Sequence, residues 1–348
     1  MKKLFPLLLC LVIALPVLPC STFLLNKNGQ LVFGRNYDWV SGNGVIVVNT
    51  AGLQKTSFTP GSHTGINWVS QFGSVTFNQF GKEFPHGGMN EKGLVVELMW
   101  LHGTEYPAPD KRAAMNELQW IQYQLDNCTT IEEVIANDTK IRIEHNSSAP
   151  LHYLVADASG RAATIEFLNG KMVVHKGNEL RYPVLTNSTY EQSIAQLDPA
   201  TRATESNNSL DRFTQACKML DTYQQGDDKT PPVDYAFNML NKVSQGKYTK
   251  WSIVYDITNK QIHFITIGNT QRRTISFSGL DLTCGQQAMS VDINAPLKGN
   301  ISGNLTTLSA EQNQQVAKRS AEESRSHVQI PEAAIAALAS YFSTIRCK

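Results

Sequence analysis

The chain has 348 residues, a formal net charge of +1 at pH 7 and 41% hydrophobic residues. This charge balance offers no basic surface for nucleic acid and no acidic tail, and the length suits one large domain or two smaller ones. After the N-terminal segment, no stretch is apolar enough to cross a bilayer, so we expect an exported, soluble protein of mixed α and β structure without a transmembrane segment.

Residues 1–19 have the pattern of a secretory signal peptide. Lys2 and Lys3 form a short basic region, and residues 4–18 form an apolar run. That run is shorter than the roughly 20 apolar residues of a membrane-spanning helix, and prolines interrupt it. We therefore expect residues 1–19 to be removed, residues 20–348 to form a single domain, and the protein to be periplasmic or secreted.

The residue after this leader is Cys20, and two outcomes compete for it. Cleavage before Cys20 would place a thiol and a free α-amine on one residue, which together form a nucleophile and a base. The alternative is a lipoprotein, because residues 17–20 also resemble a lipid-processing site and Pro19 stands where a small residue is expected. In that case Cys20 would carry a lipid anchor and the protein would not be catalytic.

The remaining cysteines of the mature chain are Cys128, Cys217, Cys284 and Cys347. None forms a Cys-x-x-Cys pair, so we expect no metal site. In an oxidising compartment they could form two disulfides, or all four could be buried thiols. A bond between Cys284 and Cys347 would tie down the C-terminal segment.

Blocks of strands alternate with blocks of helices along the chain. Strands are predicted over residues 20–25, 31–39, 45–49, 68–70, 75–77, 94–100, 151–157, 162–168, 171–175, 251–258 and 261–267. Helices are predicted over residues 115–125, from Thr130 onward, and over residues 190–197, 210–223, 235–243 and 331–345. Residues 88–93 read as a turn, and residues 294–327, rich in Ser, Gln and Asn, as a loose surface segment. This order favours an α+β fold in which two antiparallel sheets are stacked and covered by helices.

Four motifs behind the leader carry a resemblance to a known family. They are Cys20-Ser21-Thr22 with Gly34-Arg35-Asn36-Tyr37-Asp38-Trp39, then Gly88-Met89-Asn90-Glu91-Lys92-Gly93-Leu94, then Leu185-Thr186-Asn187-Ser188, and last Ser209-Leu210-Asp211-Arg212-Phe213. Together they resemble the choloylglycine hydrolase and penicillin V acylase family of N-terminal nucleophile hydrolases. The resemblance implies a four-layer αββα sandwich, no cofactor, no metal, a small-molecule amide substrate and an assembly that is often a tetramer.

The chemistry of Cys20 can be argued from the residue alone. An unperturbed thiol has a pKa of about 8.5, so only a minority is thiolate at neutral pH. An α-amine has a pKa of about 7.7–8.0 and can accept the thiol proton and later return it to a leaving amine. This pairing needs no histidine, and the 8 histidines lie outside the four motifs.

Arg35 and Asp38 lie three residues apart at the end of a predicted strand. Strand alternation places them on opposite faces unless the chain bends, and they could simply form a surface ion pair. The resemblance implies instead that Asp38 holds the α-amine and that Arg35 lowers the thiol pKa through its positive charge.

Amide cleavage also requires hydrogen-bond donors for the tetrahedral oxyanion. By resemblance, the Asn187 side chain supplies one donor and a backbone N–H near Trp100 supplies the other. Asn90 would shape the nearby turn. Arg212, on a predicted helix, would orient the site or pair with Asp38.

Trp39 and Trp100 flank the expected site and would form either aromatic walls for an acyl group or part of the core. With the export signal, they make the chain similar to the Gram-negative penicillin V acylase branch. We therefore predict a cysteine amidohydrolase acting on a linear N-acyl amide, penicillin V-like or an acyl-homoserine lactone, through an acyl-cysteine intermediate. The alternatives are a conjugated bile salt hydrolase with the same mechanism and the lipid-anchored protein described above.

Overall fold

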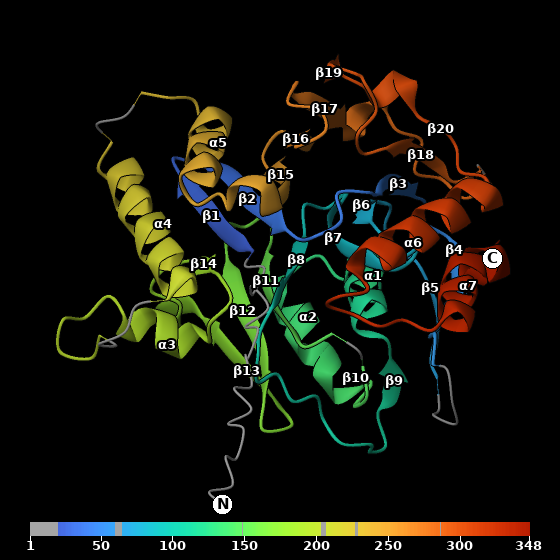
Figure 1. Ribbon diagram of the computed structural model, residues 1–348, viewed down its shortest axis with the longest axis horizontal. Coiled ribbons are helices and arrows are strands. Elements are labelled where there is room, and N and C mark those ends of the chain that lie inside the picture. Colours follow the sequence, from blue (N-terminus) through green and yellow to red (C-terminus); the bar gives the residue numbers. More distant parts are fainter. Residues whose placement is uncertain (1–19, 60–64, 148, 203–206, 227–228, 286) are drawn as a thin grey trace, which may run out of the picture.

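Two large β-sheets are stacked face to face, with helices on their outer sides (Figure 1). This arrangement comes from a computed structural model that describes residues 20–59, 65–147, 149–202, 207–226, 229–285 and 287–348. The predicted signal peptide, residues 1–19, lies outside the described residues.

The first sheet contains the hairpin that follows Cys20. Its seven strands lie in the order β14 (Val184–Leu185), β1 (Ser21–Lys27), β2 (Gln30–Asp38), β15 (Thr249–Asp256), β16 (Gln261–Thr266), β17 (Arg273–Ser276) and β19 (Gly299–Asn300). All neighbours are antiparallel except β17 and β19. The β1–β2 turn has positive φ at Asn28 and Gly29, which a tight hairpin requires and these residue types accept.

The second sheet has nine strands, and all its neighbours are antiparallel. In order they are β13 (Lys171–Lys176), β12 (Ala162–Leu168), β11 (Leu151–Ala156), β8 (Val95–Trp100), β7 (Pro85–Asn90), β6 (Ser74–Asn78), β3 (Val45–Asn49), β18 (Met289–Asp292) and β20 (Thr306–Thr307). Two small sheets stand apart: β21 (Arg346–Cys347) with β4 (Leu53–Thr56) and β5 (Asn67–Val69), and β9 (Ala113–Met115) with β10 (Ile141–Ile143).

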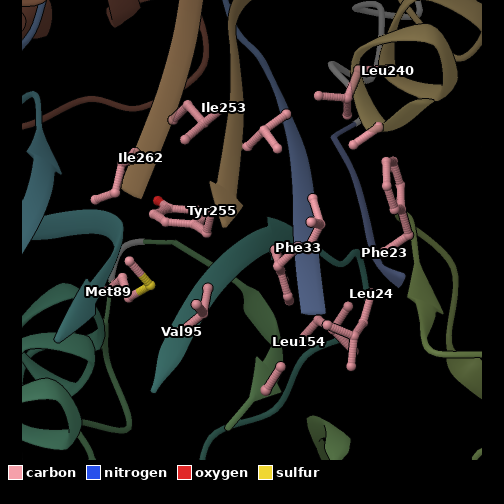
Figure 2. Packing of buried hydrophobic residues seen from close by; sticks show 14 of the residues in the cluster. Phe23, Leu24, Phe33, Met89, Val95, Leu154, Leu240, Ile253, Tyr255 and Ile262 are labelled. Carbon is pink, nitrogen blue, oxygen red and sulfur yellow. The ribbon is translucent and has the colours of Figure 1, made fainter. Parts of the chain in front are cut away.

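The core lies between the two large sheets. Figure 2 shows Leu24 and Phe33 of the first sheet directed toward Val95 and Leu154 of the second, and all four side chains are fully buried. Strands β3 and β8 of the second sheet are covered on both faces. Their sequences are therefore near-continuous apolar runs and do not alternate between apolar and polar residues.

Helices cover the outer face of each sheet. They are α1 (Glu117–Asn127), α2 (Ile131–Ala136), α3 (Tyr190–Ala195), α4 (Asn208–Gln225), α5 (Pro232–Lys242), α6 (Ala310–Ser324) and α7 (Glu332–Tyr341). Helices α4 and α5 pack on β1, β2 and β15 of the first sheet, and α1 packs on β7 and β8 of the second. The fold is therefore the α+β sandwich of two stacked antiparallel sheets that the sequence predicts.

Capping residues explain where helices α1 and α2 begin. Thr130 caps α2 and forms a capping box with Glu133, as its position in the sequence predicts. The helix predicted from residue 115 begins instead at Glu117, because the side chain of Asn116 caps it and Met115 ends strand β9. Apolar spacing alone could not separate that strand from the helix.

Two predicted irregular segments are more regular in the structure than expected. The prediction of a loose segment over residues 294–327 is wrong, because α6 occupies much of it. A capping box formed by Ser309 and Gln312 starts this helix, and small buried residues at Ala317 and Ala321 let it pack closely. The predicted turn at residues 88–93 is also shorter, since β7 continues to Asn90.

The cysteines follow neither of the two alternatives in full. Cys284 and Cys347 form a disulfide, which ties β21 to the segment near residue 284, while Cys128 and Cys217 are buried thiols. In the described ranges there is no helix long and apolar enough to span a membrane, and no cluster of His, Cys, Asp or Glu that could hold a metal ion.

Candidate active site

Cys20 stands immediately before β1 and borders a cavity of about 330 Å³. The residue is only 3% exposed, and its Sγ atom lies 3.9 Å from the backbone oxygen of Asp38, to which it can donate. The hairpin pairing of β1 with β2 thus places the thiol beside the end of the strand that carries Arg35 and Asp38.

Arg35 points from β2 toward the second sheet and is fully buried. Its Nη1 atom lies 2.6 Å from Oε2 of Glu97 on β8, and its Nη2 atom donates to the backbone oxygen of Leu98. The guanidinium also lies over the ring of Tyr37, 4.8 Å from its centroid. Arg35 is therefore held on three sides, with its positive charge close enough to lower the pKa of Cys20.

The side chain of Glu97 occupies the space that a side chain at position 87 would fill, so only glycine fits at that position. Gly87 is its partner on β7, and a Cβ atom there would lie 2.0 Å from the Glu97 Oε2 atom. The hydroxyl of Tyr255 donates to the same carboxyl group from the first sheet. Burial raises the pKa of Glu97 to about 7, although Arg35 opposes this effect.

Asp38 lies at the end of β2 and accepts a hydrogen bond from the hydroxyl of Thr249 on β15. Its other carboxylate oxygen, Oδ2, is buried and has no hydrogen-bond partner among the described residues. Burial raises the pKa of Asp38 to about 7, against the opposing effects of Thr249, Arg212 and Arg35. The thiol meets the backbone of Asp38, and Arg35 of the same strand is close enough to act on it by its charge. The pairing of β2 with β15 is irregular opposite Tyr37 and Asp38.

Arg212 on α4 joins the third and fourth motifs to Cys20. Its Nη1 atom donates to the backbone oxygen of Cys20 and to the Ser21 hydroxyl, and its Nη2 atom donates to Oδ1 of Asn187 over 3.0 Å. The Asn187 Nδ2 atom in turn donates to the backbone oxygen of Trp100 over 2.7 Å. The sequence segments near residues 20, 100, 187 and 212 therefore meet at one place.

The thiol itself is protonated at neutral pH in this arrangement. Burial raises the pKa of Cys20 to about 11, although Arg35 and Arg212 both lower it. No described histidine is hydrogen-bonded to Cys20, and its backbone nitrogen is bonded to Pro19 in the full-length chain. The base that deprotonates the thiol must therefore be a group other than a hydrogen-bonded histidine or the Cys20 nitrogen of the full-length chain.

Asn90 serves the turn and lies outside the lining of the cavity. Its Nδ2 atom donates to the backbone oxygens of Leu125 and Cys128 at the end of α1, and its Oδ1 atom accepts from the backbone of Lys92 and Leu94. These contacts match the turn-shaping role that the sequence predicts for Asn90. Both polar side-chain atoms are used in these contacts, so the structure does not place Asn90 among residues that would contact a substrate.

Trp39 and Trp100 both line the cavity beside Cys20. Their ring centroids are 5.9 Å apart, with the planes inclined by 32°. Around them the lining is largely apolar, and polar groups come mainly from the start of α1 and the segment near residue 145. The two expectations for these rings are not exclusive, because both rings line the cavity while Trp39 also belongs to the buried core and Trp100 packs against it.

Sequence reasoning missed three parts of this site. Glu97 and His86 lie outside the recognised motifs, and residues 328–338, most of which fall in the helix predicted over residues 331–345, were not assigned to the site. The paired glycines before Met89 are the one signal that could have drawn attention to Glu97, because glycine in a buried strand marks a close approach. Nothing local in the sequence marks the other two.

His86 lines the cavity with an unused ring nitrogen. Its Nδ1 atom is buried and has no hydrogen-bond partner among the described residues. The ring packs edge-on against Tyr37, with centroids 5.4 Å apart. Burial lowers the pKa of His86 to about 3, and nearby Arg35 adds to this effect, so the imidazole is neutral at physiological pH.

Comparison with known proteins agrees with this geometry. The chain is 32% identical to the penicillin V acylase of Pectobacterium atrosepticum over 173 residues, which cover 43% of this chain and 46% of that enzyme. The match therefore spans about half the length of this curated relative. Among solved structures, penicillin V acylase from Agrobacterium tumefaciens aligns with a TM-score of 0.71 and 25% identity, covering 83% of this chain and 98% of that one.

A variant of the conjugated bile acid hydrolase from Clostridium perfringens has the same fold. It aligns with a TM-score of 0.67 and 18% identity, covering 80% of this chain and 98% of that one. Residues 20–235 match the family described as linear amide C–N hydrolases, choloylglycine hydrolase family, and the matched range begins at Cys20. The chain belongs to the choloylglycine hydrolase family of linear amide C–N hydrolases.

Proposed function

We propose that the protein is a cysteine amidohydrolase that cleaves a linear N-acyl amide through an acyl-cysteine intermediate on Cys20. The observation that carries the proposal is the position of the Cys20 thiol, at the border of a largely apolar cavity and in contact with Asp38. The family match, which begins at this same residue, supports it.

In the proposed mechanism, removal of residues 1–19 gives Cys20 a free α-amine. The amine accepts the thiol proton, and the thiolate attacks the amide carbonyl carbon. The tetrahedral intermediate collapses to a thioester, and the leaving amine takes the proton from the α-ammonium group. Water then attacks the thioester with the α-amine again as base, which releases the carboxylic acid and restores the thiol.

Each group around Cys20 has a part in this scheme. The buried and unpartnered Oδ2 atom of Asp38 is suited to accept a hydrogen bond from the α-ammonium group. Arg35 stabilises the thiolate by its charge.

Asn187 uses one amide hydrogen for the backbone oxygen of Trp100, so its second hydrogen is available for the oxyanion. A backbone N–H near Trp100 is the other donor. Arg212 orients the Asn187 amide and the Cys20 backbone.

The competing lipoprotein assignment receives no support from the position of the sulfur. A lipid-modified cysteine must project its thioether toward the membrane surface, whereas Cys20 is 3% exposed and faces the interior. Residues 1–19 therefore act, in this proposal, as a signal peptide that is removed, and the mature enzyme works in the periplasm or outside the cell.

For the substrate we propose an amide with an apolar acyl group, of the penicillin V or acyl-homoserine lactone type. Two aromatic rings, Trp39 and Trp100, border the cavity beside the sulfur, and both penicillin V acylases resemble this chain more in sequence than the bile acid hydrolase does. Conjugated bile salts remain the alternative, because the same cavity is apolar enough for a sterol.

A direct experiment combines mass spectrometry with three assays. The exported protein should begin at an unmodified Cys20, and hydrolysis of penicillin V, glycocholate and a long-chain acyl-homoserine lactone should rank the substrates. Cys20→Ser should lose at least about 100-fold in kcat, because a hydroxyl has a far higher pKa than a thiol. A diacylglyceryl group on Cys20, or near-normal activity of the serine variant, would contradict the proposal.

A further inference from the structure

One side of the cavity is formed by a segment near the C-terminal end of the chain. We call residues 325–338 the C-terminal wall; they comprise the connection after α6 and the first turns of α7. The cavity-lining residues of this wall are Val328, Gln329, Ile330, Pro331, Ala334 and Leu338. On α7, Ala334 and Leu338 are four positions apart and therefore share one helix face.

The wall is attached directly to the catalytic end of the cavity. Nε1 of Trp39, the residue after Asp38, donates to the hydroxyl of Ser324 at the end of α6 over 2.7 Å. The rings of Trp39 and His327 also pack together, with centroids 5.5 Å apart. A change in the path of the wall therefore changes the surroundings of the aromatic ring that borders the thiol.

Buried polar contacts hold the two helices that carry the wall. Asn313 of α6 is fully buried; its Nδ2 atom donates to the backbone oxygen of Ala339 over 2.6 Å, and its Oδ1 atom accepts from the backbone nitrogen of Lys82 over 2.9 Å. At the end of α7, the hydroxyl of Tyr341 donates to the backbone oxygen of Thr56. These contacts hold α6 and α7 against each other, against the segment between β6 and β7, and against β4.

Beyond α7, the chain is fixed once more. Residues Arg346 and Cys347 pair with β4, and the disulfide from Cys347 to Cys284 closes the segment. Figure 1 shows α6 and α7 side by side at the edge of the sandwich, with the connection between them running inward. The wall is thus a preformed surface held at both ends.

This wall lies outside the range that matches the family. The match ends at residue 235, while the catalytic residues all lie within it. The remaining sides of the cavity, such as Leu98 and Leu151 from the second sheet, do lie within it. The cavity therefore combines a part within the matched range, which holds the catalytic residues, with one side contributed by a later segment of the chain.

We propose that the C-terminal wall sets the size of the acyl group that the enzyme accepts, with Ala334 and Leu338 as specificity-determining residues. The proposal rests on the function proposed above. An acyl chain lying along α7 gains about fourfold in kcat/KM for each methylene that it buries, until the wall stops it. The small side chain of Ala334 leaves room there, and a larger one would shorten the accepted chain.

The test is Ala334→Phe, with Ala333→Phe as the matched control. Ala333 is the neighbouring position on the same helix but is exposed and does not line the cavity. Acyl-homoserine lactones with chains of about 4 to 12 carbons should be compared by kcat/KM. Ala334→Phe should lower the value at least about 10-fold for the longest chains and less than about 3-fold for the shortest, whereas Ala333→Phe should change neither.

A second variant tests the opposite change. Leu338→Ala should shift the optimum toward longer or bulkier acyl groups, with thermal melting used to show that the variant is folded. An unchanged chain-length profile in folded Ala334→Phe and Leu338→Ala would overturn the proposal.

If the wild-type enzyme cleaves none of these amides, the proposed function fails, but the wall is still tested. Binding of butyrate and decanoate can then be followed by the fluorescence of Trp39 and Trp100. Weaker decanoate binding by Ala334→Phe but not by Ala333→Phe would support the proposed role of the wall. Equal decanoate binding by these two variants would overturn it.

Discussion

Asn187 has three partners at the site, which makes its amide orientation unusually well defined. Its Oδ1 atom accepts from Arg212, its Nδ2 atom donates to the backbone oxygen of Trp100, and its backbone nitrogen donates to the hydroxyl of Ser209. Since Nδ2 carries two hydrogens and only one is used by Trp100, the orientation of the second is set before a substrate binds. Such preorganised donors are where oxyanion stabilisation is strongest.

Replacing Asn187 with Asp should separate the two functions of this side chain. The carboxylate keeps an oxygen toward Arg212 but can no longer donate to the oxyanion, so kcat should fall about 100- to 1,000-fold with KM nearly unchanged. Steady-state kinetics on the best substrate would measure this. A variant that keeps more than a third of the wild-type kcat would show that Asn187 is not an oxyanion donor.

Asp38 should make the stability of the unprocessed chain depend on pH. Burial raises its pKa from 3.8 to about 7, so between these values the folded chain holds a proton that the unfolded chain has lost. The stabilisation from this proton is fully present below pH 3.8 and is lost as pH rises through about 7. Integrated over this window, the loss amounts to about 4 kcal/mol.

The comparison should use chains that carry Cys20→Ala and retain residues 1–19. In that background, Asp38→Asn should flatten the fall in free energy of unfolding between pH 5 and pH 8, as measured by urea denaturation. Glu97, with a pKa near the same value, contributes equally to both chains and cancels. Parallel pH profiles for the two chains would show that Asp38 is ionised throughout.

At the scale of single elements, the C-terminal segment shows how tertiary contacts stabilise a polar sequence. The face of α6 toward the interior consists of small or polar residues, including Asn313, Ala317 and Ser320. Such a face contributes little apolar burial, so the helix depends on the capping box at Ser309 and on the two hydrogen bonds of Asn313. This is why residue composition suggested a loose segment there.

The disulfide should contribute measurably to the stability of this segment. Cys284 and Cys347 are 63 positions apart, and closing a loop of that length in the unfolded chain is worth about 4 kcal/mol in the chain-entropy account. Cys347→Ser should therefore lower the free energy of unfolding by up to about this amount, as measured by guanidinium denaturation. Cys217→Ser, a change at a buried unpaired thiol, controls for the loss of a cysteine; similar effects would contradict a specific role for the bond.

On the scale of the whole molecule, the site is complete in the folded full-length chain except for its base. With the Cys20 nitrogen in a peptide bond to Pro19, burial keeps the pKa of the thiol at about 11, and the thiolate fraction at neutral pH is very small. In the proposed mechanism, folding assembles the charges and donors, and removal of residues 1–19 adds the amine that deprotonates the sulfur.

This predicts a large difference between two nearly identical proteins. Chains made by specific proteolysis should begin either at Cys20 or with one additional glycine before it. Only the first has an α-amine on the nucleophilic residue, so the second should lose at least about 100-fold in kcat, near the lower range for general base catalysis. Intact-mass measurement would verify each terminus, and equal activity of the two forms would show that the α-amine is not the base.

The sequence by itself determined the four motifs and the two-sheet architecture and predicted Cys20 as the nucleophile, because these depend on local patterns: apolar runs, turn residues, caps and short spacings. It could not place Glu97 against Arg35 or residues 325–338 along the cavity, since both contacts join segments with no mutual signal in the sequence. Only the tertiary structure decided these, through the facing of two sheets and the return of the C-terminal helices. The free energy of such contacts depends on which distant groups become neighbours when water is excluded, and local sequence patterns do not specify those neighbours.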